Sequence, residues 1–311
     1  MAVSDVPVVP VLCGPTASGK TYAALQLAGI APVEVISADS RQLYRGFDVG
    51  TAKPDPVERA ALPHHGVDVL DPLERASAAW WATEASAWIE DVCSRGRIPL
   101  VVGGTGLYLR ALFGGMFVEP AMDPERRRAL QAELASLDTV ALRRQVARLD
   151  PARAHLGRTQ LLRAIEVALL TGRRLSELQR DEATMPRWRA RYLVLDPGPP
   201  LAGAIAARAR AMFAAGWREE VRGLMRTVPE DAPAWNASGY RVVRALEQGE
   251  LSPEAAMERV IIETRQYAKR QRTWFRHQLA ESDVTRLDPG ASDAEALLFA
   301  WWKSDRSWSA A

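Results

Sequence analysis

Short, continuous apolar runs recur along the chain, and each is bounded by residues that favour turns. The clearest runs are residues 8–13, 33–38, 98–102 and 191–195. Such runs are typical of strands that are buried on both faces of a parallel sheet. The first three stop at Gly14, Asp39 and Gly103, so each of these predicted strands leads directly into a loop with glycine or a polar residue.

Stretches with helical periodicity separate these runs. The expected helices are residues 21–27, 77–95, 201–227 and 253–279. In the second of them, Trp81, Trp88 and Val92 lie on one seam, and Gly96 follows the end. Strands that alternate with helices predict an α/β fold with a parallel sheet covered on both faces. Ligands of such sheets bind beyond the carboxyl ends of the strands.

The pattern changes between residues 121 and 189. This segment is rich in Ala, Leu and Arg, contains no convincing strand, and is followed by the run at 191–195. We therefore predict an inserted helical domain, residues 121–189, within an α/β core formed by residues 1–120 and 190–311. The tail after residue 280 carries no recognisable motif.

The composition is that of a folded protein, with 48% hydrophobic and 25% charged residues. The net charge of +2 is unevenly distributed. Residues 1–118 carry nine Lys or Arg against twelve Asp or Glu, whereas residues 123–189 carry fourteen Arg against nine acids. Residues 264–278 hold five basic side chains and no acid. This distribution predicts a polyanionic partner that contacts only part of the molecule.

The two cysteines, Cys13 and Cys93, lack metal-ligand spacing, which predicts two reduced thiols in a cytosolic protein. The first ten residues include Asp5 and no basic residue, so we expect no signal peptide. Residues 98–109, the longest uncharged stretch around the second glycine cluster, are too few to span a bilayer. We expect a cytoplasmic protein without a membrane segment.

The first predicted strand leads into a complete Walker A pattern. Its residues are Gly14, Pro15, Thr16, Ala17, Ser18, Gly19, Lys20 and Thr21. The glycines let backbone N–H groups converge on phosphate oxygens, and the helix N-terminus adds its dipole. Lys20 supplies a positive charge, and Thr21 can offer its hydroxyl to Mg²⁺. The pattern predicts a P-loop NTPase-like core that holds a diphosphate or polyphosphate, with ATP as the default ligand of the motif alone.

Asp39 and Thr105 follow two other predicted strands. Asp39 has three interpretations: a carboxylate that holds Mg²⁺, a general base beside the phosphates, or the cap of a turn. Thr105 follows Gly103 and Gly104 and could hydrogen-bond a phosphate, but as an isolated feature it fits a turn better.

The predicted helix near residues 260–276 has two distinct faces. Its apolar seam recurs every seven residues, as Val260 with Ile261, Tyr267 with Ala268, and Trp274 with Phe275. A basic stripe on another face consists of Arg265, Lys269, Arg272 and Arg276. Such stripes are commonly solvated faces. Here, however, residues 264–278 contain no carboxylate to neutralise the stripe, which weakens the interpretation as a solvated face.

Together, these motifs resemble one family, the tRNA dimethylallyltransferases, also called tRNA isopentenyltransferases. The matching stretches are residues 14–21, 36–40, 48–54, 102–105, 239–241 and 264–276. They occur in the family's order and spacing. Each alone is a weak signal, but the set is highly specific.

The resemblance implies that the P-loop holds the diphosphate of dimethylallyl diphosphate rather than ATP, with Mg²⁺ as cofactor. The dimethylallyl group would pass to N6 of the adenosine immediately 3′ of the anticodon in tRNA (position 37), and diphosphate would be released. Asp39 matches the family's general base. Thr105 matches a residue at the junction of tRNA and diphosphate, and Arg208 matches an arginine on the leaving diphosphate.

The resemblance also implies a surface for the anticodon stem-loop of tRNA, on a protein that we expect to be a monomer. The basic zones at 123–189 and 264–278 would frame a base that leaves its stack to enter a buried pocket. The expected contact residues are Asp39, Ser40, Arg41, Gln42, Thr105, Arg127, Thr159, Gln160, Leu161, Leu162, Arg163, Gly239, Tyr240, Arg241, Arg265, Lys269, Arg272 and Arg276.

The chain departs from the family pattern in two places. Residues 156–160 are one residue shorter than in the family and lack its Asn-Asp pair, and residues 236–238 lack a frequent cysteine. The C-terminal zinc finger of eukaryotic relatives is also absent, which predicts the bacterial form.

Three alternatives remain open. The chain could be an adenylate isopentenyltransferase that acts on AMP or ADP, a small-molecule kinase with a helical lid, or a non-catalytic P-loop module that binds RNA. The large Arg-rich insertion argues against the first, because a mononucleotide acceptor needs no such clamp.

Overall fold

The computed structural model describes residues 6–114, 122–181, 186–279 and 283–304. The chain divides into two compact units, one formed by Met1–Phe113 with Arg187–Ala311 and the other by Gly114–Pro186. The predicted boundary between residues 120 and 121 and the first five residues lie outside the described residues. Each unit is described by itself below.

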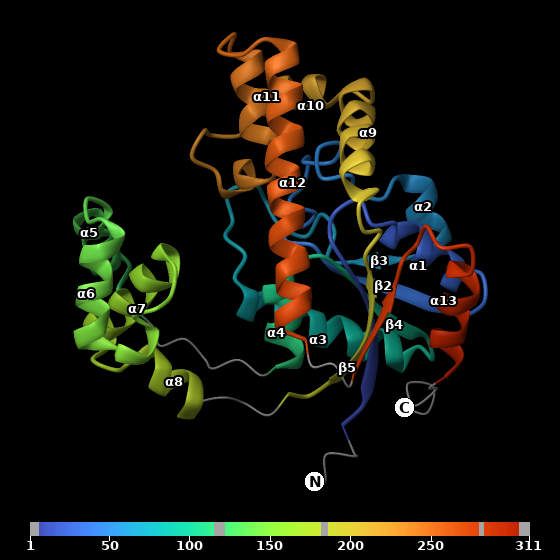
Figure 1. The fold of residues 1–311 in the computed structure, drawn as a ribbon. Coiled ribbons are helices and arrows are strands. Elements are labelled where there is room, and N and C mark those ends of the chain that lie inside the picture. The colour runs from blue at the N-terminus through green and yellow to red at the C-terminus, as the bar shows by residue number, and fades with distance from the viewer. Residues whose placement is uncertain (1–5, 115–121, 182–185, 280–282, 305–311) are drawn as a thin grey trace. The chain divides into compact units, whose positions relative to one another are not determined.

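A parallel sheet forms the centre of the larger unit (Figure 1). Its strand order is β3-β2-β4-β1-β5-β6. Gly103 pairs with both Cys13 and Ala38, and Cys13 also pairs with Val194. These residues of four neighbouring strands therefore lie level with one another. The carboxyl ends of neighbouring strands therefore meet at one edge. The strands are β1 (Val8–Cys13), β2 (Val33–Ala38), β3 (His64–His65), β4 (Ile98–Gly103), β5 (Arg189–Leu195) and β6 (Val284–Leu287).

Helices cover both faces of this sheet, which confirms the predicted α/β class. Side chains of β1 alternate between them: Leu12 belongs to the apolar core beneath α1 and α13, whereas Val11 belongs to the core beneath α3 and α4. The helices of this unit are α1 (Lys20–Ala28), α2 (Pro56–Ala61), α3 (Ala78–Ser94), α4 (Gly106–Phe113), α9 (Leu201–Ala214), α10 (Trp217–Leu224), α11 (Tyr240–Glu247), α12 (Pro253–His277) and α13 (Ala294–Lys303).

The structure corrects three details of the sequence prediction. The expected helix at residues 201–227 is two helices, because Gly216 between α9 and α10 has φ of 94°, in the left-handed region that ends a helix. The strand expected at 191–195 begins two residues earlier, at Arg189. The tail after residue 280, which carries no sequence motif, adds β6 to the sheet edge and α13 to one face.

The described residues of the smaller unit form helices joined by short turns, with no strand among them, as predicted. Its helices are α5 (Pro124–Ala135), α6 (Thr139–Leu149), α7 (Arg158–Thr171) and α8 (Leu175–Asp181). Asp123 and Asp138 cap α5 and α6, each accepting a hydrogen bond from a backbone N–H of the first turn. Leu142, Val146 and Leu161 are fully buried between these helices, so the unit has an apolar core of its own.

The long helix α12 has the apolar seam that the sequence predicts. Val260, Ala268 and Phe275 are buried, and the helix packs against α4, α9 and α11 of the same unit (Figure 1). Ser252 caps its first turn through the N–H of Ala255. None of the described helices is long and apolar enough to cross a membrane.

A half-buried carboxylate, Glu220, fixes the loop at residues 48–51 to α10 and α11. Glu220 accepts hydrogen bonds from the backbone N–H groups of Asp48 (2.9 Å) and Val49 (2.7 Å) and from the hydroxyl of Tyr240 (2.6 Å). The Tyr240 hydroxyl in turn accepts from the N–H of Gly50 at 3.1 Å. Burial, followed by the nearby negative charge of Glu220, raises the pKa of Tyr240 well above its usual range. The hydroxyl therefore stays protonated and donates to Glu220.

This network predicts that removal of one oxygen atom, the hydroxyl of Tyr240, lowers the stability of the protein. Tyr240→Phe should lower the free energy of unfolding by about 1–3 kcal/mol, because it leaves the Gly50 N–H unpaired and removes a hydrogen bond to a charged group. The control is Tyr22→Phe, since the Tyr22 side chain is 67% exposed and its hydroxyl accepts one long hydrogen bond from Gln26. Its effect should be below about 0.5 kcal/mol. Equal effects of the two substitutions in urea denaturation would contradict the stabilising role of this network.

Candidate active site

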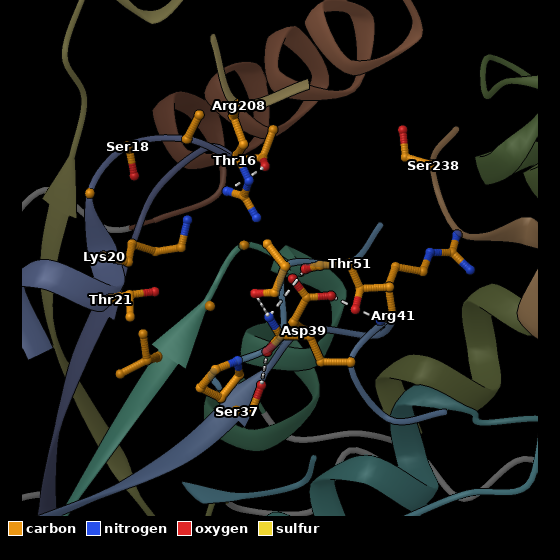
Figure 2. A pocket seen from close by; sticks show the side chains of 18 of the residues that line it. Thr16, Ser18, Lys20, Thr21, Ser37, Asp39, Arg41, Thr51, Arg208 and Ser238 are labelled. Atoms are coloured by element: carbon orange, nitrogen blue, oxygen red, sulfur yellow. Dashed lines mark hydrogen bonds between the residues drawn. The ribbon is translucent and has the colours of Figure 1, made fainter. Parts of the chain in front are cut away.

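A cavity of about 470 Å³ opens at the carboxyl edge of the sheet. The P-loop forms one wall, and residues that follow β2, together with the loop at 50–52, form another. Side chains of α9 and α12 complete the lining. Figure 2 shows Lys20, Arg208 and Asp39 directed toward this common space from three different segments. All of the lining belongs to the larger unit.

The P-loop has the conformation of an anion cradle. Ala17 and Gly19 have φ of 62° and 83°, in the left-handed region, so successive peptide groups change direction around the loop. The hydroxyl of Ser18 is buried and has no hydrogen-bond partner among the described residues. A buried polar atom of this kind is normally satisfied by a partner. An oxygen of a phosphate group would supply one here.

Two cations face the cavity. The Lys20 ammonium donates to the carbonyl oxygens of Gly14 (3.1 Å) and Pro15 (2.7 Å), and Arg208 Nη1 donates to the Thr16 hydroxyl at 3.4 Å. Burial, and secondly the positive charge of Arg208, lower the pKa of Lys20 to about 8. Burial also lowers the pKa of Arg208, and the Asp39 carboxylate opposes that shift. The site therefore concentrates positive charge, and a bound polyanion would relieve the repulsion.

The Asp39 carboxylate is oriented by its own turn. Its Oδ1 accepts a hydrogen bond from the N–H of Arg41 at 2.8 Å, which is the turn-capping role considered from the sequence. No hydrogen bond to Oδ2 is found within the described residues. One oxygen thus holds the side chain in place while the other stays available toward the cavity, so a capping role and a chemical role are compatible.

Thr105 acts on the same turn from the neighbouring strand. Its hydroxyl oxygen accepts from the N–H of Ser40 at 3.1 Å, and its own N–H donates to the carbonyl of Ala38 at 3.1 Å. The residues that follow β2 and β4 are therefore joined directly beside Asp39. Thr105 itself is half-buried.

The predicted tRNA-contact residues differ widely in exposure. Thr159, Gln160, Arg241, Arg265, Lys269 and Arg276 are exposed. Leu161, Gly239 and Tyr240 are buried, so the side chains of Leu161 and Tyr240 are not available to a partner. The half-buried residues are Asp39, Ser40, Arg41, Gln42, Thr105, Arg127, Leu162, Arg163 and Arg272.

The side chain of Gln42 is hydrogen-bonded to other residues of the protein. Its Nε2 donates to the carbonyl of Ala52 at 3.1 Å, and its Oε1 accepts from the Ser37 hydroxyl at 3.2 Å. The side chain thereby ties the end of β2 to the loop at 50–52. Both segments line the cavity, so Gln42 shapes the site as well as facing it.

The residues of the basic stripe on α12 differ in whether an ion pair neutralises them. Lys269 and Arg276 are exposed, and no ion pair to either is found within the described residues. Arg272, in contrast, donates from Nε to Asp196 at 3.0 Å. Asp196 directly follows β5, so the neutralising carboxylate that is missing from the local sequence comes from a distant segment. Arg272 is held at the edge of the sheet rather than projecting with the rest of the stripe.

Within the smaller unit, two predicted contact arginines share one buried carboxylate. Glu166, which is 5% exposed, pairs with Arg127 Nη2 at 3.1 Å and with Arg163 Nη1 at 2.9 Å, and it accepts from Gln131 at 2.7 Å. The pairing fixes the directions of both guanidinium groups on the surface of α5 and α7.

Sequence reasoning missed one residue of the site, Gln271. Its carboxamide, 7% exposed, accepts from the N–H of Thr16 at 2.8 Å and donates to the carbonyl of Gly104 at 2.9 Å. A signal was available, since Gln271 lies between Ala268 and Phe275 on the apolar seam of α12. A polar side chain at a buried helical position must find hydrogen-bond partners.

No group of three or more metal-binding side chains of the His, Cys, Asp and Glu types is found in the described residues. Thr21 and Asp39 are among the side chains that line the cavity and could approach an ion there. This donor set fits Mg²⁺ that is held mainly by phosphate oxygens and water, as is usual for that ion. It does not fit a metal held by protein ligands alone.

Comparison with known proteins identifies close relatives. A family model described as IPP transferase matches residues 42–278. The chain is 43% identical to the tRNA dimethylallyltransferase of Methylococcus capsulatus over 305 residues, covering 95% of this chain and 98% of that protein. It is 46% identical to the tRNA dimethylallyltransferase of Thermus thermophilus over 290 residues, covering 92% and 94%.

Solved structures show the same similarity. The tRNA isopentenylpyrophosphate transferase of Staphylococcus epidermidis superposes with a TM-score of 0.67 at 30% identity, covering 96% of this chain and 98% of that one. A eukaryotic dimethylallyltransferase acting on tRNA superposes with a TM-score of 0.79 at 27% identity, covering 94% of this chain and 77% of that one.

The lowered pKa of Lys20 predicts proton uptake when an anion binds. At pH 8.5 most of the free protein would carry neutral Lys20, since its pKa is about 8. Diphosphate favours the charged ammonium, so binding of inorganic diphosphate with Mg²⁺ should take up about 0.5–0.8 proton per site. Calorimetry in two buffers of different ionisation enthalpy measures this number.

The matched control is Lys20→Arg. Arginine keeps the positive charge but does not deprotonate, so its proton uptake at pH 8.5 should be smaller by the contribution of Lys20. Identical uptake in the two proteins would show that Lys20 is already fully charged in the free site.

Proposed function

Because the chain belongs to the IPP transferase family, it is a tRNA-modifying prenyltransferase, and we propose that it uses dimethylallyl diphosphate to modify N6 of the adenosine 3′ of the anticodon, position 37. The observation that carries this proposal is the single cavity. It combines a phosphate cradle, a cationic wall and a carboxylate from separate segments at one edge of the sheet.

The donor fits the P-loop side of the cavity. Backbone N–H groups of residues 14–21, the Ser18 hydroxyl and the charges of Lys20 and Arg208 match a diphosphate. The cavity lining also includes Ile205, Ala209, Met212 and Val260, which offer an apolar surface for a short branched hydrocarbon. Bound Mg²⁺, for which Thr21 is our candidate ligand, would neutralise part of the diphosphate charge.

The reaction follows from these positions. The C–O bond between the allylic carbon and the diphosphate breaks, and a C–N bond forms to the exocyclic nitrogen of the base. Lys20 and Arg208 stabilise the negative charge that grows on the leaving diphosphate. The nitrogen loses one proton, and we assign its acceptance to the oxygen of Asp39 that the Arg41 N–H does not bind. The aromatic amine is a weak nucleophile, so removal of this proton assists its attack.

The acceptor fits an RNA rather than a mononucleotide. The exposed basic residues of α12 and the arginines of the smaller unit provide more positive surface than a mononucleotide can use. A base buried in a stem would not reach the cavity, whereas an anticodon loop presents unstacked bases. We therefore propose that the anticodon stem-loop is the part of tRNA that binds.

One assay tests the proposed function. The protein is incubated with dimethylallyl diphosphate labelled in the allyl group, Mg²⁺, tRNA transcript and AMP, and each product is separated. Label in tRNA, located at the adenosine 3′ of the anticodon, is the expected result. Label in AMP alone would indicate an adenylate prenyltransferase, and transfer of phosphate from added ATP to a small acceptor would indicate a kinase.

The sharpest prediction for the chemistry concerns Asp39→Asn. The amide keeps the oxygen that accepts from Arg41 N–H, so the turn and the fold should remain intact. It removes proton acceptance, and the single-turnover rate should fall by about 10²–10⁴-fold, roughly 3–5 kcal/mol of barrier, with RNA affinity little changed. Weaker diphosphate binding that high Mg²⁺ restores would instead identify Asp39 as a metal ligand. A rate close to wild type would remove Asp39 from the chemical step.

The basic stripe predicts a salt-dependent contribution to RNA binding. Lys269→Ala and Arg276→Ala should each weaken binding of the tRNA and make its dependence on salt concentration shallower by about one unit. Lys303→Ala removes an exposed lysine from α13 and serves as the control, with no expected change in slope. Fluorescence anisotropy at several salt concentrations measures both quantities. Equal slopes for the control and the two stripe variants would contradict the assignment.

A further inference from the structure

The carboxamide of Gln271 joins three segments that are distant in sequence. It accepts from the N–H of Thr16 in the P-loop and donates to the carbonyl of Gly104 after β4, while its backbone belongs to α12. Both contacts are buried or partly buried, at 2.8 and 2.9 Å. A single side chain thus connects the predicted phosphate cradle with the turn that holds Thr105 and with the helix that carries the basic stripe.

Packing around Gln271 reinforces this connection. One turn before it, Ala268 packs with Ala17 of the P-loop and with Ile205 of α9. One turn after it, Trp274 lies so close to the turn after β4 that a Cβ on Gly106 would be 2.2 Å from the indole ring. A Cβ on Gly104 would lie 2.3 Å from Gln271 Nε2. The glycines of this turn therefore permit the close approach of α12.

The neighbouring positions on α12 point to a different partner. Lys269 and Arg276 are exposed on the stripe, and Arg272 is paired with Asp196 at the end of β5. The RNA-facing and P-loop-facing sides of this helix are consequently two faces of the same short segment. Any ligand that restrains the segment from one side restrains the hydrogen bonds made from the other.

We propose that Gln271 is a positioning residue that couples the two substrate sites, so that RNA bound along α12 and diphosphate bound in the P-loop each strengthen binding of the other. The inference rests on the proposed function. Its physical basis is shared ordering: both ligands require the bridge from Thr16 through Gln271 to Gly104 in one arrangement. The second ligand to bind meets a bridge that the first has already fixed.

The test is a binding cycle with two probes, inorganic diphosphate with Mg²⁺ and an anticodon stem-loop RNA. Calorimetry gives the Kd of diphosphate for the free protein and for the protein saturated with RNA. In the wild type, RNA should tighten diphosphate binding by a factor within the range usual for coupled sites, roughly 5–150-fold. In Gln271→Met, which keeps the length of the side chain but makes neither hydrogen bond, the factor should fall close to one while both probes still bind.

Two further variants complete the design. Gln266→Met makes the same substitution at an exposed position on the same helix and should keep the wild-type factor. Gly104→Ala displaces the Gln271 amide from the opposite side without changing Gln271, and should also bring the factor close to one, which keeps the test decisive if Gln271→Met does not fold.

Several outcomes would overturn the coupling. It fails if the wild type shows a factor of one, or if Gln271→Met keeps the wild-type factor. A lower melting temperature with an unchanged factor would give Gln271 a structural role only. The proposed function is separable: a wild type that transfers label to tRNA with a factor of one loses only the coupling. A wild type that couples the two probes but transfers no label loses only the proposed activity.

Discussion

The arrangement of the site depends on one constraint, the level alignment of neighbouring parallel strands. Register pairs Gly103 with both Cys13 and Ala38, so β1, β2 and β4 end together, and β5 ends beside them. The residues that come next are Gly14, Asp39, Gly104 and Asp196. One edge of the sheet thus carries the phosphate cradle, the candidate base, the turn held by Gln271 and the partner of Arg272. The chemistry of the site follows from where the strands stop.

Much of this edge could be predicted from sequence because its information is local. Buried strands of a parallel sheet read as continuous apolar runs, and the glycine or aspartate that ends each run marks the loop that follows. The Walker pattern and the position of Asp39 are therefore visible without a structure. Two-residue β3 is too short to leave such a pattern, and the break between α9 and α10 depends on one glycine whose left-handed backbone is not evident from composition.

The remaining features could not be predicted because they join distant segments. Asp196 and Arg272 are 76 residues apart, and Thr16 and Gln271 are 255 residues apart. A local count of charges along α12 leaves Arg272 without a partner, and only the fold brings the carboxylate to it. The role of Gln271 could be predicted only in part. Its position on an apolar seam indicates that it must be hydrogen-bonded, but not to what.

Two pairs of cationic side chains in this protein have different surroundings. Arg127 and Arg163 both pair with the buried carboxylate of Glu166, which orients their guanidinium groups. Arg208 and Lys20 are instead brought together without full neutralisation, and burial lowers the pKa of both. Such a pair is unfavourable in the free protein and becomes favourable as negative charge increases opposite it. In the proposed reaction a leaving diphosphate gains charge as its bond to carbon breaks. We therefore propose that this arrangement favours the departing group over the bound ester, which is the condition for stabilising a transition state.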